Sequence, residues 1–219
     1  MSALDAKLLR DLWRLKGQVV AVALVVASGT ALLVMSLSAL TSLRVTAETY
    51  YDRYRFAEVF ATLTRAPEAM ADRIARIPGV QAVETRVSAF ATVDIPRMAE
   101  PVMARLISLP EGEEPLLNRL ALRAGRTVAP GRPDEVVVNA PFAEAHGLRP
   151  GDRLSVLMRG TRRELTVVGI ALSPEYVYAI SPGGLMPDDA RFGVLWMGRA
   201  ALGAAYDLDG AFNDVSLAL

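Results

Sequence analysis

The 219-residue sequence contains no cysteine and only one histidine, His146. Without cysteine the chain has no disulfide bonds, no thiolate zinc site and no cysteine nucleophile. A single histidine cannot build a histidine-rich metal site, and we interpret His146, which directly precedes Gly147, as a helix-end residue rather than a catalytic base. The sequence therefore predicts no catalytic, cofactor-binding or metal-binding residues, and we expect the chain not to be an enzyme.

The sequence also lacks the glycine-rich loop ending in Gly-Lys-Ser or Gly-Lys-Thr that binds nucleotide phosphates. Its nearest feature, Gly183-Gly184, is followed by leucine and methionine, so no lysine can contact a phosphate. We therefore expect that this chain does not hydrolyse ATP by itself. The charge is balanced, with 24 Lys and Arg against 24 Asp and Glu, so the basic excess typical of nucleic-acid-binding proteins is absent as well.

Two groups of acidic residues do not form recognisable metal sites. Asp207, Asp209 and Asp214 surround a glycine, but an EF-hand loop requires glycine at its sixth position and glutamate at its twelfth, and both are missing here. We interpret these three residues as turn formers. Asp188 and Asp189 are adjacent, so their side chains diverge and have no identifiable carboxylate partner, and we interpret them as helix caps.

What the chain does contain is one long apolar run. Gly17 to Leu43 are 27 consecutive residues without a charge. A helix of this length measures roughly 40 Å, more than the roughly 30 Å of a bilayer's hydrocarbon core. Each leucine or valine near its centre favours insertion by roughly 0.3 to 0.6 kcal/mol. We predict a transmembrane helix at residues 17–43; the alternatives are a cleaved signal peptide, with a weak site at Ser36 and Ser38, and a buried helix of a soluble protein.

Residues 1–16 predict a cytoplasmic amphipathic helix. It would start at a capping-box-like pair, Ser2 and Asp5, and place its apolar side chains on one stripe. The stripe consists of Leu4, Leu8, Leu12 and Leu15, with Leu9 and Trp13 beside it. The cations Lys7, Arg10, Arg14 and Lys16 would hold this end in the cytoplasm and so leave the rest of the chain outside. The alternative is a simple continuation of the spanning helix.

Three small residues recur along the spanning helix at intervals of four. Ala23, Ala27 and Ala31 would form a smooth face, with Ser28 and Gly29 beside it. Small faces allow membrane helices to approach closely, so we predict helix packing at these alanines. The alternative is that alanine is simply common in this segment.

Residues 44–56 contain no helix breaker and carry a cluster of tyrosines, Tyr50, Tyr51 and Tyr54. We predict that the helix continues through this segment to about Arg55 as a stalk beyond the membrane, with the tyrosines at its outer interface.

Residues 57–219 predict one extracytoplasmic domain, which makes the chain α+β: an N-terminal transmembrane helix followed by a mixed α/β domain with a β-α-β unit and a second β-rich lobe. The predicted strands are 58–65, 80–95 as one or two strands, 101–109, 134–139, 154–158, 164–171, 193–197 and 213–219. The predicted helices are 67–77, 140–146 and 199–206. The second lobe is expected after a loop-rich segment at 111–133. Because the chain ends on a strand, we expect sequence to be missing beyond it.

The segment after the strand at 164–171 is too rich in proline and glycine for regular structure, and it contains Tyr176 and Tyr178. Their spacing would place both rings on one side of an extended segment. The two tyrosines would then contact a partner or line an export path; the alternative is the packed face of a short edge strand.

The order of these features resembles the amino-terminal part of an FtsX-like ABC transporter permease with a MacB-like periplasmic core domain. The resemblance covers nearly the whole chain and rests on the motifs IPGV, DEVVVN, GLRPGD, ELTVVGIA and SPEYVY. The residues that match are Pro78-Gly79-Val80, Asp134-Glu135-Val136, Gly151-Asp152 and Val168-Gly169, all at structural positions. The resemblance is therefore informative about family and uninformative about substrate.

The resemblance implies a permease subunit in the cell inner membrane, with a separate cytoplasmic ABC ATPase that binds the ATP, and with other permease helices or a second permease copy as partners. It also implies further transmembrane helices after the outer domain, so we expect the sequence to be truncated before them. Its helix and stalk would transmit ATP-driven motion to the outer domain, in export or mechanotransmission. A rival hypothesis from another class is a single-pass membrane-anchored binding or scaffold module, which needs no ATPase. Neither substrate nor direction of transport can be predicted.

Overall fold

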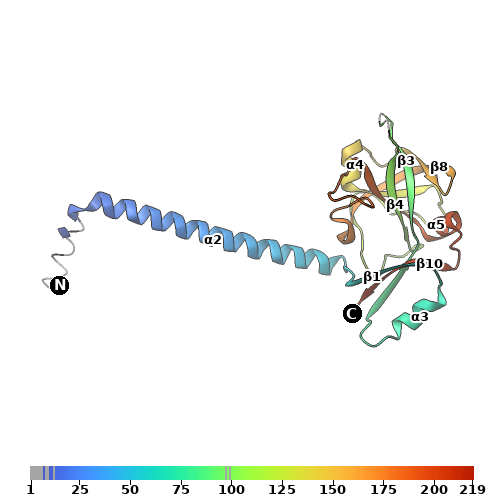
Figure 1. Cartoon of the computed structure of the whole chain (residues 1–219), viewed down its shortest axis with the longest axis horizontal. Coiled ribbons are helices and arrows are strands. Elements are labelled where there is room, and N and C mark those ends of the chain that lie inside the picture. The colour runs from blue at the N-terminus through green and yellow to red at the C-terminus, as the bar shows by residue number, and fades with distance from the viewer. Residues whose placement is uncertain (1–6, 8–9, 12, 97, 99) are drawn as a thin grey trace. The chain divides into compact units, whose positions relative to one another are not determined.

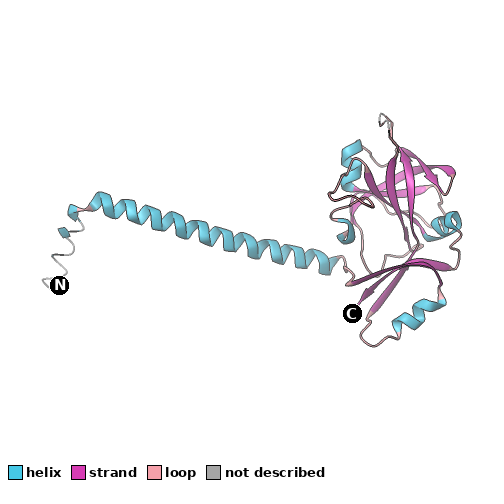
Figure 2. Ribbon diagram, viewed as in Figure 1, coloured by secondary structure: helices cyan, strands magenta, loops and turns pink. Residues whose placement is uncertain are grey.

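The computed structural model describes residues 7, 10–11, 13–96, 98 and 100–219. The chain divides into two compact units, Met1–Thr49 and Tyr50–Leu219. Figures 1 and 2 show a long helix and a sheet-rich domain. The α+β class predicted from the sequence is confirmed.

Helix α2 runs without interruption over Lys16–Arg53, and none of its 38 residues is buried. It is long and apolar enough to span a membrane. Several of its hydroxyl groups, those of Ser28, Thr30, Thr41 and Thr46, donate to the helix's own carbonyls; Thr30 Oγ1, for example, donates to Val26 O at 2.8 Å. The helix thus continues unbroken from the uncharged run to Arg53, close to the predicted end at about Arg55, while the membrane crossing and the stalk beyond it stay predictions. The predicted amphipathic helix falls partly outside the described residues, because Ser2, Leu4, Asp5, Leu8, Leu9 and Leu12 are not among them.

A three-stranded sheet lies at one end of the domain (Figure 1). It contains β1 (Val59–Pro67), β2 (Ala82–Arg86) and β10 (Ala211–Ala218). Strand β10 lies in the middle and is antiparallel to both neighbours. Helix α3 (Ala69–Ala75) packs Met70 and Ile74 against Phe212 and Val215 of β10.

The larger sheet has seven strands in the order β5-β8-β6-β9-β4-β3-β7, and a further pairing of β7 with β8 closes it on itself. The strands are β3 (Ser88–Asp94), β4 (Val102–Leu109), β5 (Ala121–Gly125), β6 (Glu135–Asn139), β7 (Arg153–Met158), β8 (Thr161–Leu172) and β9 (Phe192–Gly198). Two short helices connect strands of this sheet, α4 (Ala140–His146) and the 3₁₀ helix η1 (Pro174–Tyr176), and α5 (Arg199–Tyr206) leads from β9 to β10 of the smaller sheet.

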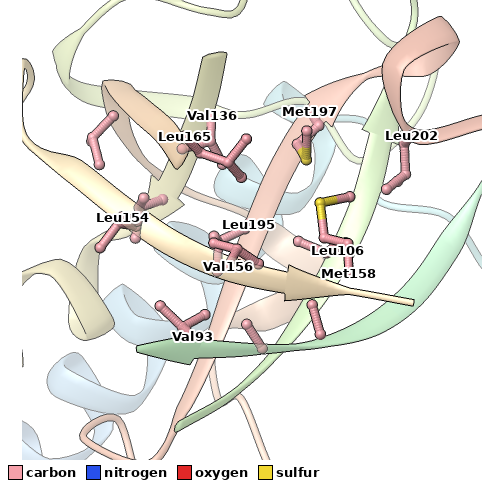
Figure 3. Close-up of a cluster of buried hydrophobic side chains, with 14 of the residues drawn as sticks. Val93, Leu106, Val136, Leu154, Val156, Met158, Leu165, Leu195, Met197 and Leu202 are labelled. Carbon is pink, nitrogen blue, oxygen red and sulfur yellow. The ribbon is translucent and has the colours of Figure 1, made fainter. Parts of the chain in front are cut away.

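The closed sheet surrounds the main hydrophobic core. Alternation along β7 and β8 places Leu154, Val156, Leu165 and Val167 inside, where they meet residues of β4, β6 and β9 (Figure 3). A second cluster, which includes Trp196, is built on other residues of β4, β6, β8 and β9. Every residue of β9 is buried, because the strand is covered on both of its faces. This explains its unbroken apolar sequence.

Two local features explain how β8 fits its neighbours. Arg159 and Gly160 both have positive φ, as a tight hairpin turn between β7 and β8 requires. Gly169 lies so close to β5 that a Cβ atom there would approach Arg126 O to 2.2 Å, so only glycine fits at this point. The matched pair Val168-Gly169 is thus a packing position.

Three expectations about the domain need correction. The segment 111–133 contains strand β5, which the sequence analysis missed. The β1-α3-β2 unit is split, because β10 lies between its two strands. The larger lobe begins at β3 rather than after residue 133, and the smaller one takes its central strand from the end of the chain. Strand alternation shows which residues are buried but not which strands are neighbours, so the sequence could not reveal this order.

Candidate coupling site

The chain enters the domain through a short segment that is fixed by a loop from farther along the sequence. We call residues 54–57 the exit segment and residues 116–119 the clamp loop. Asn118 N donates to Arg55 O at 2.9 Å, and Arg119 N donates to Tyr54 O at 2.8 Å. In return, Ala57 N donates to the side-chain Oδ1 of Asn118 at 3.0 Å. Three hydrogen bonds thus hold the residues that directly follow α2.

The backbone at both sides of this contact is unusual. Arg55 and Asn118 both have positive φ, at 49° and 51°. The left-handed conformation of Arg55 ends the helix, while asparagine is one of the few residues that adopts it readily. Asn118 is 5% exposed and Ala57 fully buried, so water does not compete for their bond.

The clamp loop is also fixed to the three-stranded sheet. Leu116 N donates to Glu84 Oε2 of β2 at 2.6 Å. Asn118 Nδ2 donates to Ser216 Oγ of β10 at 3.4 Å, a long bond between two buried groups. Burial raises the pKa of Glu84, and the backbone amides of Leu116 and Leu117 only partly offset this. The loop therefore joins the exit segment to two strands.

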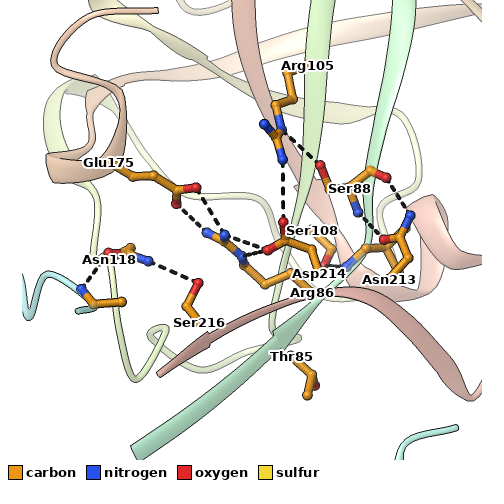
Figure 4. A network of polar contacts seen from close by, with 12 residues as sticks. Thr85, Arg86, Ser88, Arg105, Ser108, Asn118, Glu175, Asn213, Asp214 and Ser216 are labelled. Carbon is orange, nitrogen blue, oxygen red and sulfur yellow. Dashed lines mark hydrogen bonds and ion pairs between the residues drawn. The ribbon is translucent and has the colours of Figure 1, made fainter. Parts of the chain in front are cut away.

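Two residues along β10 from Ser216, Asp214 enters a buried group of charges (Figure 4). Asp214 Oδ1 accepts from Arg86 Nη2 at 2.6 Å and from Arg86 Nε at 2.8 Å. The same guanidinium donates to both carboxylate oxygens of Glu175, at 2.5 and 3.1 Å. Arg105 Nη2 reaches Asp214 Oδ2 at 3.4 Å. We call Arg86, Arg105, Glu175 and Asp214 the Arg86 cluster.

The charges of the Arg86 cluster compensate one another. Burial lowers the pKa of Arg86, but its contacts with Glu175 and Asp214 outweigh this and raise it overall. Tyr176 Oη donates to Glu175 Oε1 at 2.8 Å, and burial raises the pKa of this tyrosine. The positive charges of two arginines balance the negative charges of two carboxylates in a region with little access to water. Removing one of the four would therefore leave an uncompensated charge.

The cluster joins three parts of the domain. Arg86 ends β2 of the smaller sheet, Arg105 belongs to β4 of the larger one, and Glu175 belongs to η1. The chain crosses from β2 to β3 beside it, where Val87 N donates to Ser108 Oγ at 2.8 Å and Ser88 N to Asn213 Oδ1 at 2.7 Å. The two sheets are thus joined by polar side-chain contacts as well as by the chain that runs from β2 to β3.

A groove of about 740 Å³ lies beside the exit segment. Arg53 and Tyr54 line it at the end of α2, and the segments 109–115, 119–122 and 126–130 supply the remaining wall. Arg126, one of the lining residues, is held by Glu135, with its Nη2 at 2.6 Å from Glu135 Oε1. The hydrogen bonds from Arg126 lower the pKa of Glu135 to about 2, against the opposing effect of burial.

The structure separates the two tyrosines that the sequence placed together. Tyr176 closes η1, with its ring centroid 6.3 Å from that of Trp196, whereas Tyr178 is 74% exposed. They share neither a strand nor a face, because Pro174 and the Ser173 cap start a 3₁₀ turn here.

Ala23, Ala27 and Ala31 all lie on exposed positions of α2. Helix packing at these alanines, and partner contact at the tyrosines, stay predictions.

The interpretation of the acidic residues as turn formers is correct for two of the three. Asp207, which follows α5 in a left-handed conformation and pairs with Arg159, and Asp209 lie in turns, whereas Asp214 lies within β10 and forms buried ion pairs. Asp188 caps a turn rather than a helix, accepting from Ala190 N and Arg191 N at 3.1 Å each.

His146 does end α4, as predicted, with its Nε2 2.9 Å from Ala190 O. The sequence analysis missed Arg86, Asn118 and Glu175 altogether. One available signal was Asp214, a carboxylate in the middle of a predicted strand, which requires a cationic partner if the strand is buried.

Comparison with known proteins gives structural neighbours only. No protein-family model and no curated protein matches the sequence. The extracellular domain of YknZ, a noncanonic ABC-type transporter from Gram-positive bacteria, is similar with a TM-score of 0.46 and 15% identity, over 75% of this chain and 79% of that one. The periplasmic region of MacB from Actinobacillus actinomycetemcomitans is similar with a TM-score of 0.42 and 12% identity, over 74% of this chain and 66% of that one.

A domain of a predicted permease protein from Porphyromonas gingivalis gives a TM-score of 0.42 and 13% identity, over 72% of this chain and 65% of that one. These neighbours are extracellular or periplasmic regions and a permease domain.

Proposed function

We propose that this chain is the membrane-spanning permease subunit, or part of it, of an ABC transporter. A separate cytoplasmic ATPase hydrolyses ATP, helix α2 carries the resulting motion across the membrane, and the domain beyond it changes its contacts in export or mechanotransmission. The chain itself supplies no nucleotide site and acts as a mechanical component rather than an enzyme.

The observation that carries this proposal is the clamped exit segment. A tether that merely anchored a domain would need no fixed connection after its helix, and a flexible linker would serve as well. Here Ala57 is held by Asn118, and Arg55 and Tyr54 are held by the clamp loop. Movement of the helix end would therefore reach β10 and β2 directly.

The sequence supports the remaining parts. The uncharged run suits a bilayer crossing, and the cations at Lys7, Arg10, Arg14 and Lys16 favour a cytoplasmic N-terminus. The domain would then lie outside the inner membrane. Ala23, Ala27 and Ala31 would pack against other permease helices or a second copy, and the exposed Tyr178 would contact a partner outside.

Orientation can be tested with single cysteines, because the natural chain has none to react. Lys7→Cys and Thr127→Cys would be labelled in intact cells with a membrane-impermeant maleimide. We expect labelling at position 127 only, and labelling at position 7 only after the membrane is opened. Labelling of both positions in a water-soluble product would contradict the membrane crossing.

The transporter function is tested by copurification. The tagged full chain would be extracted from its native membranes in mild detergent, and the bound proteins would be searched for a Walker-type ATPase by mass spectrometry. We expect one ATPase in stoichiometric amount. A correctly oriented chain without any nucleotide-binding partner would favour the anchored binding or scaffold module instead.

A further inference from the structure

The Arg86 cluster lies between two features that the proposed function does not connect. One is the exit segment, where α2 enters the domain. The other is η1 with the segment that follows it, which we call the outer loop, residues 177–187. Within the outer loop Tyr178 is 74%, Met186 77% and Leu185 96% exposed, far more than an apolar side chain in a core.

A series of contacts joins these two features. From the exit segment, Ala57 bonds to Asn118, and Asn118 bonds to Ser216 on β10. Along the same strand Asp214 binds Arg86, which in turn binds Glu175 in η1. Figure 4 shows these side chains in succession, with Arg86 between Asp214 and Glu175.

We propose that Arg86 is a positioning residue that couples η1, from which the outer loop starts, to the exit segment, so that displacement at either end changes the other. The proposal rests on the proposed function only for its biological purpose; the coupling itself is a property of the isolated chain. Coupling of this kind is reciprocal, so it can be tested from both ends.

Three features make Arg86 suited to this role. Its side chain is 8% exposed, so water cannot replace a lost carboxylate contact at little cost. Its guanidinium is rigid and planar and uses separate N–H groups for Asp214 and Glu175, so the two carboxylates are fixed relative to each other. Since Asp214 belongs to the smaller sheet and Glu175 to the segment beside the larger one, a shift of one sheet reaches the other through this side chain.

The test measures amide hydrogen exchange in the full chain reconstituted in bilayer nanodiscs, without any ATPase. Glu175→Gln removes one charge from the cluster and keeps the size of the side chain. We expect the amide of Ala57 to exchange about tenfold faster, within the range of typical coupling between sites. Asn118→Gly removes the side-chain bonds to Ala57 and Ser216 but tolerates positive φ, and we expect the amides of Glu175 and Tyr176 to exchange faster by a similar factor.

Glu135→Gln is the matched control. Glu135, like the partly buried Glu175, accepts from both terminal nitrogens of one arginine, here Arg126, but it lies outside the series of contacts. We expect it to leave exchange at Ala57 unchanged. A further variant, Ser216→Ala, interrupts the series between Asn118 and Asp214 and should abolish the effect of Glu175→Gln on Ala57.

Two results would overturn the proposal. If Glu175→Gln accelerates exchange only around η1, the cluster is a local structural element. If Glu135→Gln accelerates exchange at Ala57 as much as Glu175→Gln does, both act through general loss of stability. Neither result bears on the ATPase partner, which the copurification decides, so failure of the coupling and failure of the transporter function are distinguishable.

Discussion

Helix α2 and the domain that follows it obtain their stability in opposite ways. None of the helix's 38 residues is buried, although its mean hydropathy over the most apolar stretch is 2.4. The domain, in contrast, encloses its apolar residues in clusters of its own, inside and around a closed sheet. The domain thus contains its hydrophobic environment, whereas the helix needs one from outside, which a lipid bilayer or other helices would supply.

The contrast is largest for loss of an apolar side chain. Leu195 is fully buried in the main core, and Leu195→Ala should lower the domain's free energy of unfolding by about 2–5 kcal/mol. The same change at Leu33, 61% exposed on the helix, should alter it by less than about 0.5 kcal/mol. Denaturant titration followed by the fluorescence of the buried Trp196 measures both. Equal losses would mean that the helix packs against the domain.

A charged substitution, unlike loss of an apolar side chain, should have its large effect in the helix. Leu33→Arg should make insertion of the helix into the membrane less favourable by roughly 3 kcal/mol, because the insertion scale gives arginine a cost of about 2.5 to 3.5 kcal/mol at a helix centre. Leu185→Arg, in the outer loop, is the control and should have no effect. The fraction of chain that resists carbonate extraction from membranes reports the difference. If both variants stay equally membrane-bound, residues 17–43 do not cross the bilayer.

Acid should affect the domain and spare the helix, whose uncharged run has nothing to titrate. The pKa of Glu135 is lowered by Arg126 to about 2, from an ordinary 4.5. A carboxyl group whose pKa is lowered by folding stabilises the fold at pH values above its unfolded-state pKa. This stability is lost as the pH falls from about 4.5 towards 2. Melting temperatures measured across that interval should fall for the natural chain and fall less for Glu135→Gln. Parallel curves would show that the Arg126 pair contributes nothing.

The smallest expected effect comes from Glu84, whose pKa is shifted in the opposite direction to that of Glu135. Burial raises the pKa of Glu84, so the folded domain favours its protonated form and loses stability as pH rises through the raised value. In Glu84→Gln, the amide oxygen of the new side chain would still accept the bond from Leu116 N without carrying a charge. We expect this variant to raise the melting temperature slightly at neutral pH and to leave it unchanged in acid. A clear loss at neutral pH would mean that the charge itself holds the clamp loop.

The helix could be predicted from the sequence because its signal is local: a run of residues without charge has few other structures available. Strands such as β8 were equally accessible, since alternation and β-branched residues mark them directly. Strand order was not, and the position of β10 between β1 and β2 depends on contacts across the length of the chain.

The coupling site was out of reach for the same reason. Asp214 has turn-forming neighbours in sequence, whereas its ion-pair partner Arg86 lies 128 residues away. The role of Asn118 depends on its left-handed backbone and on its contact with Ala57, and both arise only when the domain has folded. Local pattern therefore identified the helix and most strands, but not the polar contacts that connect them.

The most direct test of the account is amide exchange at Ala57 in the complex of the full chain with its copurified ATPase, reconstituted in nanodiscs. Exchange would be compared in the absence of nucleotide and with ATP bound to a hydrolysis-deficient ATPase variant. If α2 transmits motion to the clamp loop, exchange at Ala57 and Asn118 should change with ATP, while exchange at Leu195 in the main core should not. Identical exchange at Ala57 in both nucleotide states would contradict a coupling role for this chain.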